Sequence, residues 1–134
     1  MTKLADIEGI GEAYSKKLEE GGIHSIEQLL EVGGEKKGRQ GIAEKCDISE
    51  KLVLKWLNRA DLARIKGVST QYADLLECAG VDTVPELAQR NAANLHEKMV
   101  SVNEDKKLVR QVPSASQVED WVKQAKELPR AIHY

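Results

Sequence analysis

The sequence contains no phenylalanine, and aromatic residues make up only 4% of its 134 residues. A core built without phenylalanine has to consist mainly of Leu, Ile, Val and Ala side chains. Hydrophobic residues (41%) and charged residues (31%) occur in the proportions of a globular protein rather than a disordered one. The length suits one compact domain, or two small repeats that share a core.

Long apolar runs are also missing. No run reaches the roughly 20 residues that a membrane-spanning helix needs, and the first residues lack the apolar segment of a signal peptide. The two cysteines, Cys46 and Cys78, lie in helical contexts without CxxC spacing, which predicts reduced, partly buried thiols. We therefore expect a cytoplasmic protein with no membrane partner.

The sequence has no excess of positive charge. Residues 1–61 contain ten Lys and Arg against twelve Asp and Glu, and residues 62–134 contain ten against ten. Dedicated DNA-binding domains are usually basic, because neutralising phosphates supplies much of their affinity. Any nucleic-acid site must therefore be a local patch, and its binding must be weak.

Comparison of the sequence with itself reveals a repeat. The segment that begins at Leu4 aligns without gaps to the segment that begins at Leu62, 58 residues later, and a second match pairs Trp56 with Trp121 at a larger offset. The larger offset predicts an insertion in the second copy. The identical residues of the first copy are Leu4, Ala5, Ile7, Gly9, Tyr14, Leu18, Glu19, Gly22 and Leu29.

Each copy has the periodicity of helices, and no stretch alternates as a strand does. Gly22 and Gly80 are expected to end helices in left-handed conformation. Ser25-x-x-Gln28 and Thr83-x-x-Glu86 have the pattern of capping boxes that begin the next helix. The sequence thus predicts an all-α fold, a tandem duplication with repeats at residues 1–61 and 62–134 around a shared core.

The pattern apolar-x-Gly-apolar-Gly before a helix, at Ile7 to Gly11, resembles the helix-hairpin-helix motif. The second copy keeps Ile65-Lys66-Gly67-Val68 but has Ser69 at the second glycine position. The whole chain resembles a bacterial family of tandem helix-hairpin-helix proteins whose function is uncharacterised.

The resemblance implies contact with DNA phosphates without sequence preference. Together with the charge balance and the lack of catalytic motifs, it predicts a non-catalytic protein that binds nucleic acid weakly. In such motifs the N–H groups of the turn contact a phosphate. The acidic Glu8 and Glu12 beside the first turn oppose this reading. The implied nucleic-acid-binding residues, with nearby cations, are Gly9, Ile10, Gly11, Lys16 and Lys17 in the first copy and Lys66, Gly67, Val68 and Ser69 in the second.

Residues 33–41, GGEKKGRQG, carry the densest positive charge, with Lys36, Lys37 and Arg39 among four glycines. We expect a mobile loop here. It is either only solvated, the interpretation we favour, or it adds phosphate contacts beside the first turn as the best basic patch of the chain. A smaller basic cluster lies at residues 106–110. Residues 42–57 resemble a helix-turn-helix with Asp47 in place of the turn glycine, but two packed helices joined by a short turn produce the same pattern, and we favour that interpretation.

The alternative to nucleic-acid binding is a protein-interaction or scaffold module in which the turns only pack helices. Whichever function holds, we expect Trp56 and Trp121 to be core anchors that link each Trp helix to its hairpin. We expect the ending PRAIHY to pack back on the bundle or to dock on a partner protein.

Few residues have the pattern of a catalytic, metal-binding or cofactor-binding site. The histidines are scattered without metal-ligand spacing, and no nucleophile motif is present. Gly9-x-Gly11 is not a dinucleotide-binding loop, since Tyr14 occupies the third glycine position and no strand precedes it. We expect no enzyme activity, cofactor, metal or small-molecule substrate.

Overall fold

The computed structural model describes Leu4, Ile7 and residues 10–133, without the side chain of Thr70. Within these residues it contains eight α-helices and no strand, which confirms the all-α prediction. No helix of this described part is long and apolar enough to cross a bilayer. The chain divides into two compact units: unit 1 comprises residues 1–61 and 131–134, and unit 2 comprises residues 62–130.

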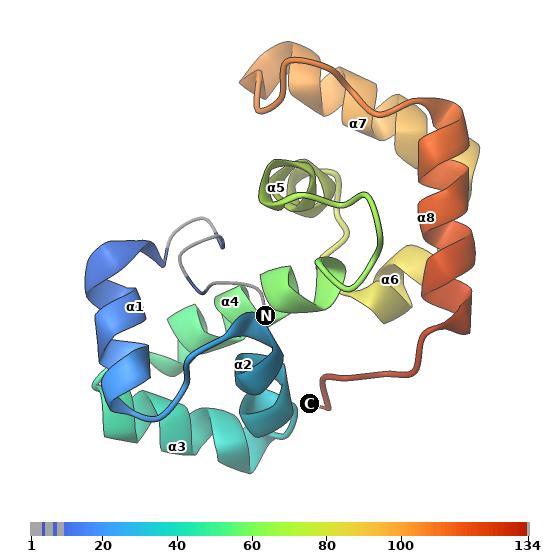
Figure 1. Cartoon of the computed structure of the whole chain (residues 1–134). Helices are drawn as coiled ribbons and strands as arrows, with labels where there is room; N and C mark the ends of the chain where they lie inside the picture. The colour runs from blue at the N-terminus through green and yellow to red at the C-terminus, as the bar shows by residue number, and fades with distance from the viewer. Residues whose placement is uncertain (1–3, 5–6, 8–9, 134) are drawn as a thin grey trace. The chain divides into compact units, whose positions relative to one another are not determined.

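Unit 1 is built from four helices (Figure 1), the last of which ends at the first residue of unit 2. They are α1 (Gly11–Glu20), α2 (Ile26–Gly33), α3 (Lys36–Cys46) and α4 (Glu50–Leu62). Helix α3 packs against both α1 and α2. The apolar stripes of the helices meet around Trp56, which is fully buried and packs beside Leu18, Leu29 and Leu57. Burial of these aliphatic stripes is the main source of stability of a bundle of such short helices.

The C-terminal residues complete unit 1. Ile132 is buried in the same cluster as Trp56. The N–H of His133 donates to the carbonyl of Gly34 over 2.6 Å. The expectation that the C-terminal segment packs back on the bundle is therefore confirmed.

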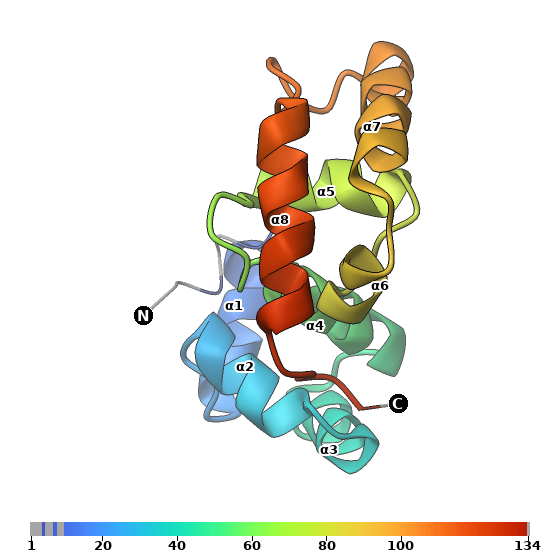
Figure 2. The same cartoon turned by 90° about the vertical axis from the view of Figure 1, so that its right-hand side faces the viewer.

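Unit 2 also has four helices among its described residues, α5 (Thr70–Cys78), α6 (Val84–Ala88), α7 (Ala92–Lys106) and α8 (Ala115–Glu127). Helix α8 packs against α6 and α7, and Figure 2 shows α7 and α8 side by side. Trp121 lies in the core with Leu75, Leu76 and Met99. Residues 107–114 connect α7 to α8, whereas only residues 47–49 connect α3 to α4, so most of the added length of the second copy lies in this segment.

The two units share local backbone structure at an offset of 58 residues. Ile23 N–H donates to Leu18 O over 2.9 Å, and Val81 N–H donates to Leu76 O over 2.9 Å. Gly22 has φ +92° and Gly80 has φ +97°, so both glycines are left-handed as predicted, a conformation that side chains with a Cβ rarely adopt. A tyrosine–tryptophan ring pair also recurs, Tyr14 with Trp56 at 5.1 Å and Tyr72 with Trp121 at 5.5 Å between ring centroids.

Three local expectations were wrong. Thr83 makes no side-chain cap at the start of α6, although the side chain of Glu86 accepts a hydrogen bond from the N–H of Asp82. A full capping box occurs instead at the start of α8, between Ser114 and Gln117. Cys78 is exposed rather than partly buried. Residues 36–41 belong to α3 and are not a loop.

Candidate nucleic-acid interface

The most completely described candidate site is the turn before α5, residues 65–69, which we call turn 2. Two hydrogen bonds shape its backbone: Ile65 N–H donates to Leu62 O over 3.1 Å, and Val68 N–H donates to Ile65 O over 3.2 Å. The side chains of Ile65 and Val68 are buried in the core of unit 2. Ser69 then caps α5, since its Oγ accepts from the N–H of Tyr72 over 3.2 Å. Turn 2 is therefore anchored on its apolar side.

The other side of turn 2 presents hydrogen-bond donors to solvent. Gly67 and Ser69 are exposed, and within the described residues their main-chain N–H groups have no hydrogen-bond partner. Lys66 is exposed beside them. Unpartnered N–H groups at the start of a helix, together with the helix dipole, favour an anion. Turn 2 thus has the local chemistry of a phosphate contact.

Helix α8 holds turn 2 in place through Gln124. The Lys66 N–H donates to Gln124 Oε1 over 2.9 Å, and Gln124 Nε2 donates to Lys66 O over 3.2 Å. Gln124 Nε2 also donates to Asp120 Oδ2 over 2.9 Å. Nothing in the sequence identifies Gln124 in this role, because a glutamine that braces a turn and a solvated glutamine on a helix follow the same pattern.

Trp121 lies directly beneath the turn. Gly67 has φ +97°, and a Cβ built at this position would lie 3.0 Å from Trp121 Nε1. This close approach and the positive φ explain why glycine stands here. The recurrence of tryptophan in both copies was the one sequence pattern that indicated an anchor at this position.

The corresponding turn before α1, residues 7–11, which we call turn 1, is described only in part. Glu8 and Gly9 lie outside the described residues. Ile10 is buried and its N–H donates to Ile7 O over 3.2 Å, as Val68 does in turn 2. Gly11 has φ +63° and opens α1, whereas Ser69 at the equivalent position has φ −81°. Turn 1 therefore has no serine cap.

The helix that follows turn 1 carries both acidic and basic residues. Glu12, Lys16 and Lys17 are exposed, and Lys17 Nζ lies 5.8 Å from the centre of the Tyr14 ring. In unit 2 the position of Lys17 is taken by the buried Leu75. The two turns thus differ in the charge that accompanies them.

The basic stretch at residues 33–41 does not act as one patch. Lys36 and Lys37 are exposed in the first turn of α3. The Arg39 side chain turns inward and is only 6% exposed. Its guanidinium donates to the carbonyl oxygens of Gly33 over 3.0 Å, Gly34 over 3.2 Å and His133 over 2.9 Å. Arg39 therefore ties the C-terminal residues to the end of α2.

Other chemistry is sparse near the turns. Within the described residues no group of three or more His, Cys, Asp and Glu could hold a metal ion. Burial raises the pKa of the Cys46 thiol, and the nearby charge of Lys45 lowers it by a smaller amount. Cys46 lies in the core of unit 1 and belongs to neither turn.

The described residues define an all-helical chain in which the turn ahead of α5 is anchored on its apolar side and presents unpartnered N–H donors to solvent. The chain belongs to the family described as a domain of unknown function, DUF4332, whose model matches residues 8–128. No curated protein and no solved structure matches the chain.

Proposed function

We propose that the protein is a non-catalytic binding protein that contacts nucleic-acid phosphates without reading their sequence. Turn 2 carries the proposal: the unpartnered N–H groups of Gly67 and Ser69 lie beside the exposed Lys66 on a turn that Gln124 braces. Because main-chain donors recognise phosphate oxygens and not base edges, such a contact positions the strand but does not specify it.

Turn 1 acts in the same way in this proposal, as the first of two helix-hairpin-helix motifs. Ile10 and Gly11 lead into α1, and Lys16 and Lys17 supply the positive charge that turn 2 obtains from Lys66. Exposed Lys36 and Lys37 add charge at the start of α3. Arg39 is not included, because its guanidinium is bound to main-chain carbonyls.

The test is fluorescence anisotropy of labelled DNA, titrated with protein at low and at physiological salt. We expect dissociation constants of roughly 10⁻⁴–10⁻⁶ M that rise with salt. Lys66→Glu is expected to weaken binding by about tenfold, whereas Lys123→Glu, the same charge reversal on the exposed face of α8, is expected to change it much less. Equal effects of the two variants would refute a contact at turn 2.

A second pair of variants tests turn 1. The double variant Lys16→Glu with Lys17→Glu reverses two charges on α1, and Lys51→Glu with Lys55→Glu reverses two on α4. Only the first pair is expected to reduce affinity strongly. Circular dichroism of each variant shows that it remains helical, which separates lost contacts from lost folding.

The alternative function, a protein-interaction module, has one observation in its favour. Val32 on α2 is 49% exposed and lines a cavity of about 350 Å³ with the apolar Ile42 and the glycines Gly38 and Gly41. An exposed apolar residue beside a hollow fits a protein contact. If the module acts in this way, Val32→Glu abolishes capture of partners in a pull-down and leaves DNA anisotropy unchanged.

We also place the protein in the cytoplasm. Both cysteines are free thiols and Cys78 is exposed, an arrangement that a reducing compartment tolerates.

A further inference from the structure

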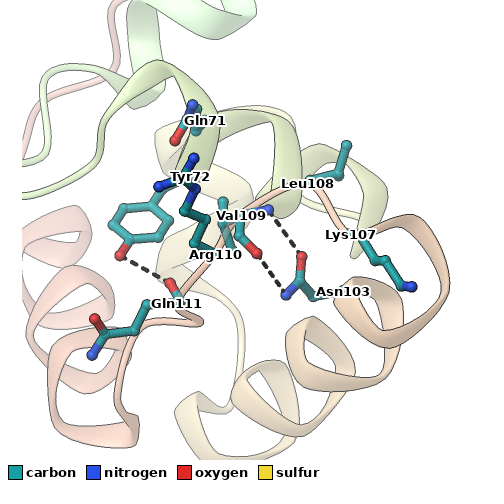
Figure 3. Close-up of a pocket in the computed structure, with 8 residues that line it drawn as sticks. All are labelled: Gln71, Tyr72, Asn103, Lys107, Leu108, Val109, Arg110 and Gln111. Carbon is teal, nitrogen blue, oxygen red and sulfur yellow. Dashed lines mark hydrogen bonds between the residues drawn. The ribbon is translucent and has the colours of Figure 1, made fainter.

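A cavity formed by described residues lies in unit 2, outside turn 2. It has a volume of about 770 Å³ and opens between the first turn of α5 and the segment that follows α7. Figure 3 shows its lining residues, which are Gln71, Tyr72, Asn103, Lys107, Leu108, Val109, Arg110 and Gln111. Sites that enclose drug-sized ligands have volumes of about 300–1,000 Å³, so this cavity is large enough for a ligand of nucleotide size.

The wall formed by residues 107–111 is held firmly. Asn103 Nδ2 donates to Val109 O over 3.1 Å, and Val109 N–H donates to Asn103 Oδ1 over 3.0 Å. The Tyr72 hydroxyl donates to Gln111 O over 3.1 Å, and the Val109 side chain is buried. Both hydrogen-bonded connections are drawn in Figure 3. The backbone that carries Lys107 and Arg110 is thus anchored on each side of Arg110, and ordering it on binding costs little.

The charge of the cavity is positive. Figure 3 shows the Arg110 guanidinium extended toward Gln71 and Tyr72, with Lys107 at the opposite end of the segment. Neither cation has an ion-pair partner within the described residues, and no acidic residue is among those that line the cavity. Glu104 and Asp105 lie on α7 just before this segment, but they do not line the cavity. Arg and Lys are the residues that bind phosphate oxygens.

Two amide side chains add a second kind of recognition. The amides of Gln71 and Gln111 line the cavity and have no hydrogen-bond partner within the described part of the chain. Each amide offers a donor and an acceptor, the combination that binds the hydrogen-bonding edge of a base. In a duplex the Watson–Crick edge of each base is paired with the opposite base, so a base can bring this edge into a cavity only when it is unpaired.

We propose that this cavity binds an unpaired nucleotide, with its phosphate on Arg110 and its base edge on the amide of Gln71. Lys107, at the other end of the segment, contacts a neighbouring phosphate when the nucleotide is part of a strand. The nucleotide is free or is one unit of a single strand. This inference takes only the class of partner, a nucleic acid, from the proposed function, because none of the cavity residues belongs to turn 2. It predicts that the protein prefers single strands to duplexes.

Titrations followed by amide chemical shifts in nuclear magnetic resonance test this directly. The probes are thymidine monophosphate, a short oligothymidylate, a duplex of the same length and inorganic phosphate. Saturable shifts at the Gln71 side chain and at residues 108–111 with the monophosphate or the oligothymidylate support the proposal. Shifts there only with inorganic phosphate or only with the duplex overturn it.

A charge-matched pair of variants links these shifts to affinity. Lys107→Gln with Arg110→Gln is expected to weaken oligothymidylate binding by about tenfold and to reduce the slope of log affinity against log salt by about 1.4, the value for two lost phosphate contacts on a single strand. Lys98→Gln with Lys123→Gln removes the same charge from exposed positions of α7 and α8 that do not line the cavity. Equal losses in the two variants would overturn the assignment.

The same spectra distinguish this site from turn 2. If the oligothymidylate moves the amides of Gly67 and Ser69 but not those of the cavity, the proposal fails and the proposed function stands. If it moves the cavity amides alone, the contact at turn 2 fails and the nucleotide site stands.

Discussion

Replacing Gly67 with alanine is the sharpest test of how turn 2 is built. The added Cβ meets two obstacles, a backbone φ of +97° and the indole of Trp121, whose Nε1 lies 3.0 Å away. Trp121 is 2% exposed, so its ring is unable to swing into solvent to make room. Positive φ costs an alanine about 1–2 kcal/mol, and overpacking of a buried contact typically costs about 1–3 kcal/mol more.

Gly80→Ala is the matched control in the same unit. Gly80 also has φ +97°, but the atom nearest to its added Cβ is Arg90 Nη1 at 3.4 Å, an ordinary contact with a flexible side chain. Both substitutions reduce the entropy of the unfolded chain equally. The expected difference between the two free energies of unfolding is therefore the cost of the Trp121 contact, about 1–3 kcal/mol.

Urea unfolding followed by circular dichroism and tryptophan fluorescence measures both variants. Gly67→Ala is expected to have the lower midpoint with an unchanged slope. A double-mutant cycle sharpens the result, because in a Trp121→Leu background Gly67→Ala and Gly80→Ala are expected to cost nearly the same. If Gly67→Ala and Gly80→Ala lower the free energy of unfolding equally in the natural sequence, Gly67 does not pack against Trp121 as described.

Three further predictions concern unit 1 and its cysteine. Arg39→Ala removes three hydrogen bonds from a charged donor to main-chain carbonyls and is expected to lower the free energy of unfolding by about 2–4 kcal/mol. Arg39→Lys, measured by the same urea titration, is expected to retain part of this stability. Equal losses in the two variants would contradict the role of the planar guanidinium. Ile132→Ala deletes a buried side chain of the C-terminal segment and is expected to cost about 2–5 kcal/mol, with thermal unfolding as the measurement; a change below 1 kcal/mol, roughly the level of a surface substitution, would show that the segment does not pack there. For the thiols, an aromatic disulfide reagent is expected to modify exposed Cys78 at once and buried Cys46 only on unfolding. Burial raises the pKa of the Cys46 thiol in the folded protein. The contribution of Cys46 to stability is therefore complete below the ordinary thiol pKa, and it declines at higher pH as the thiol of the unfolded chain ionises. Cys46→Ala is expected to remove this decline, and a pH profile of stability that does not change in the variant would contradict the prediction.

Local features of single helices could be predicted from the sequence because they depend on short-range geometry. Gly22 and Gly80 were correctly identified as left-handed helix ends, since a glycine after an amphipathic stretch has few other uses. The buried positions of Trp56 and Trp121 followed from their place on apolar stripes. The all-α class followed from the same 3.6-residue periodicity.

Features that depend on which surface a side chain meets required the tertiary structure. Residues 36–41 have the composition of a loop, yet α3 forms there because its apolar face packs on α1 and α2. Arg39 appears in the sequence as one more surface cation, and only the return of residues 131–133 to unit 1 places carbonyl groups around it.

The same division holds for the candidate sites. The sequence alone determined where turn 2 begins and that Gly67 and Ser69 flank an apolar residue. Only the tertiary structure decided that Gln124 braces this turn and that Arg110 shares a cavity with Gln71. Helix packing brings these pairs together although their members are 39 or more positions apart in the sequence. Sequence patterns record the periodicity of one element, whereas a site assembled from several elements exists only once their faces have packed.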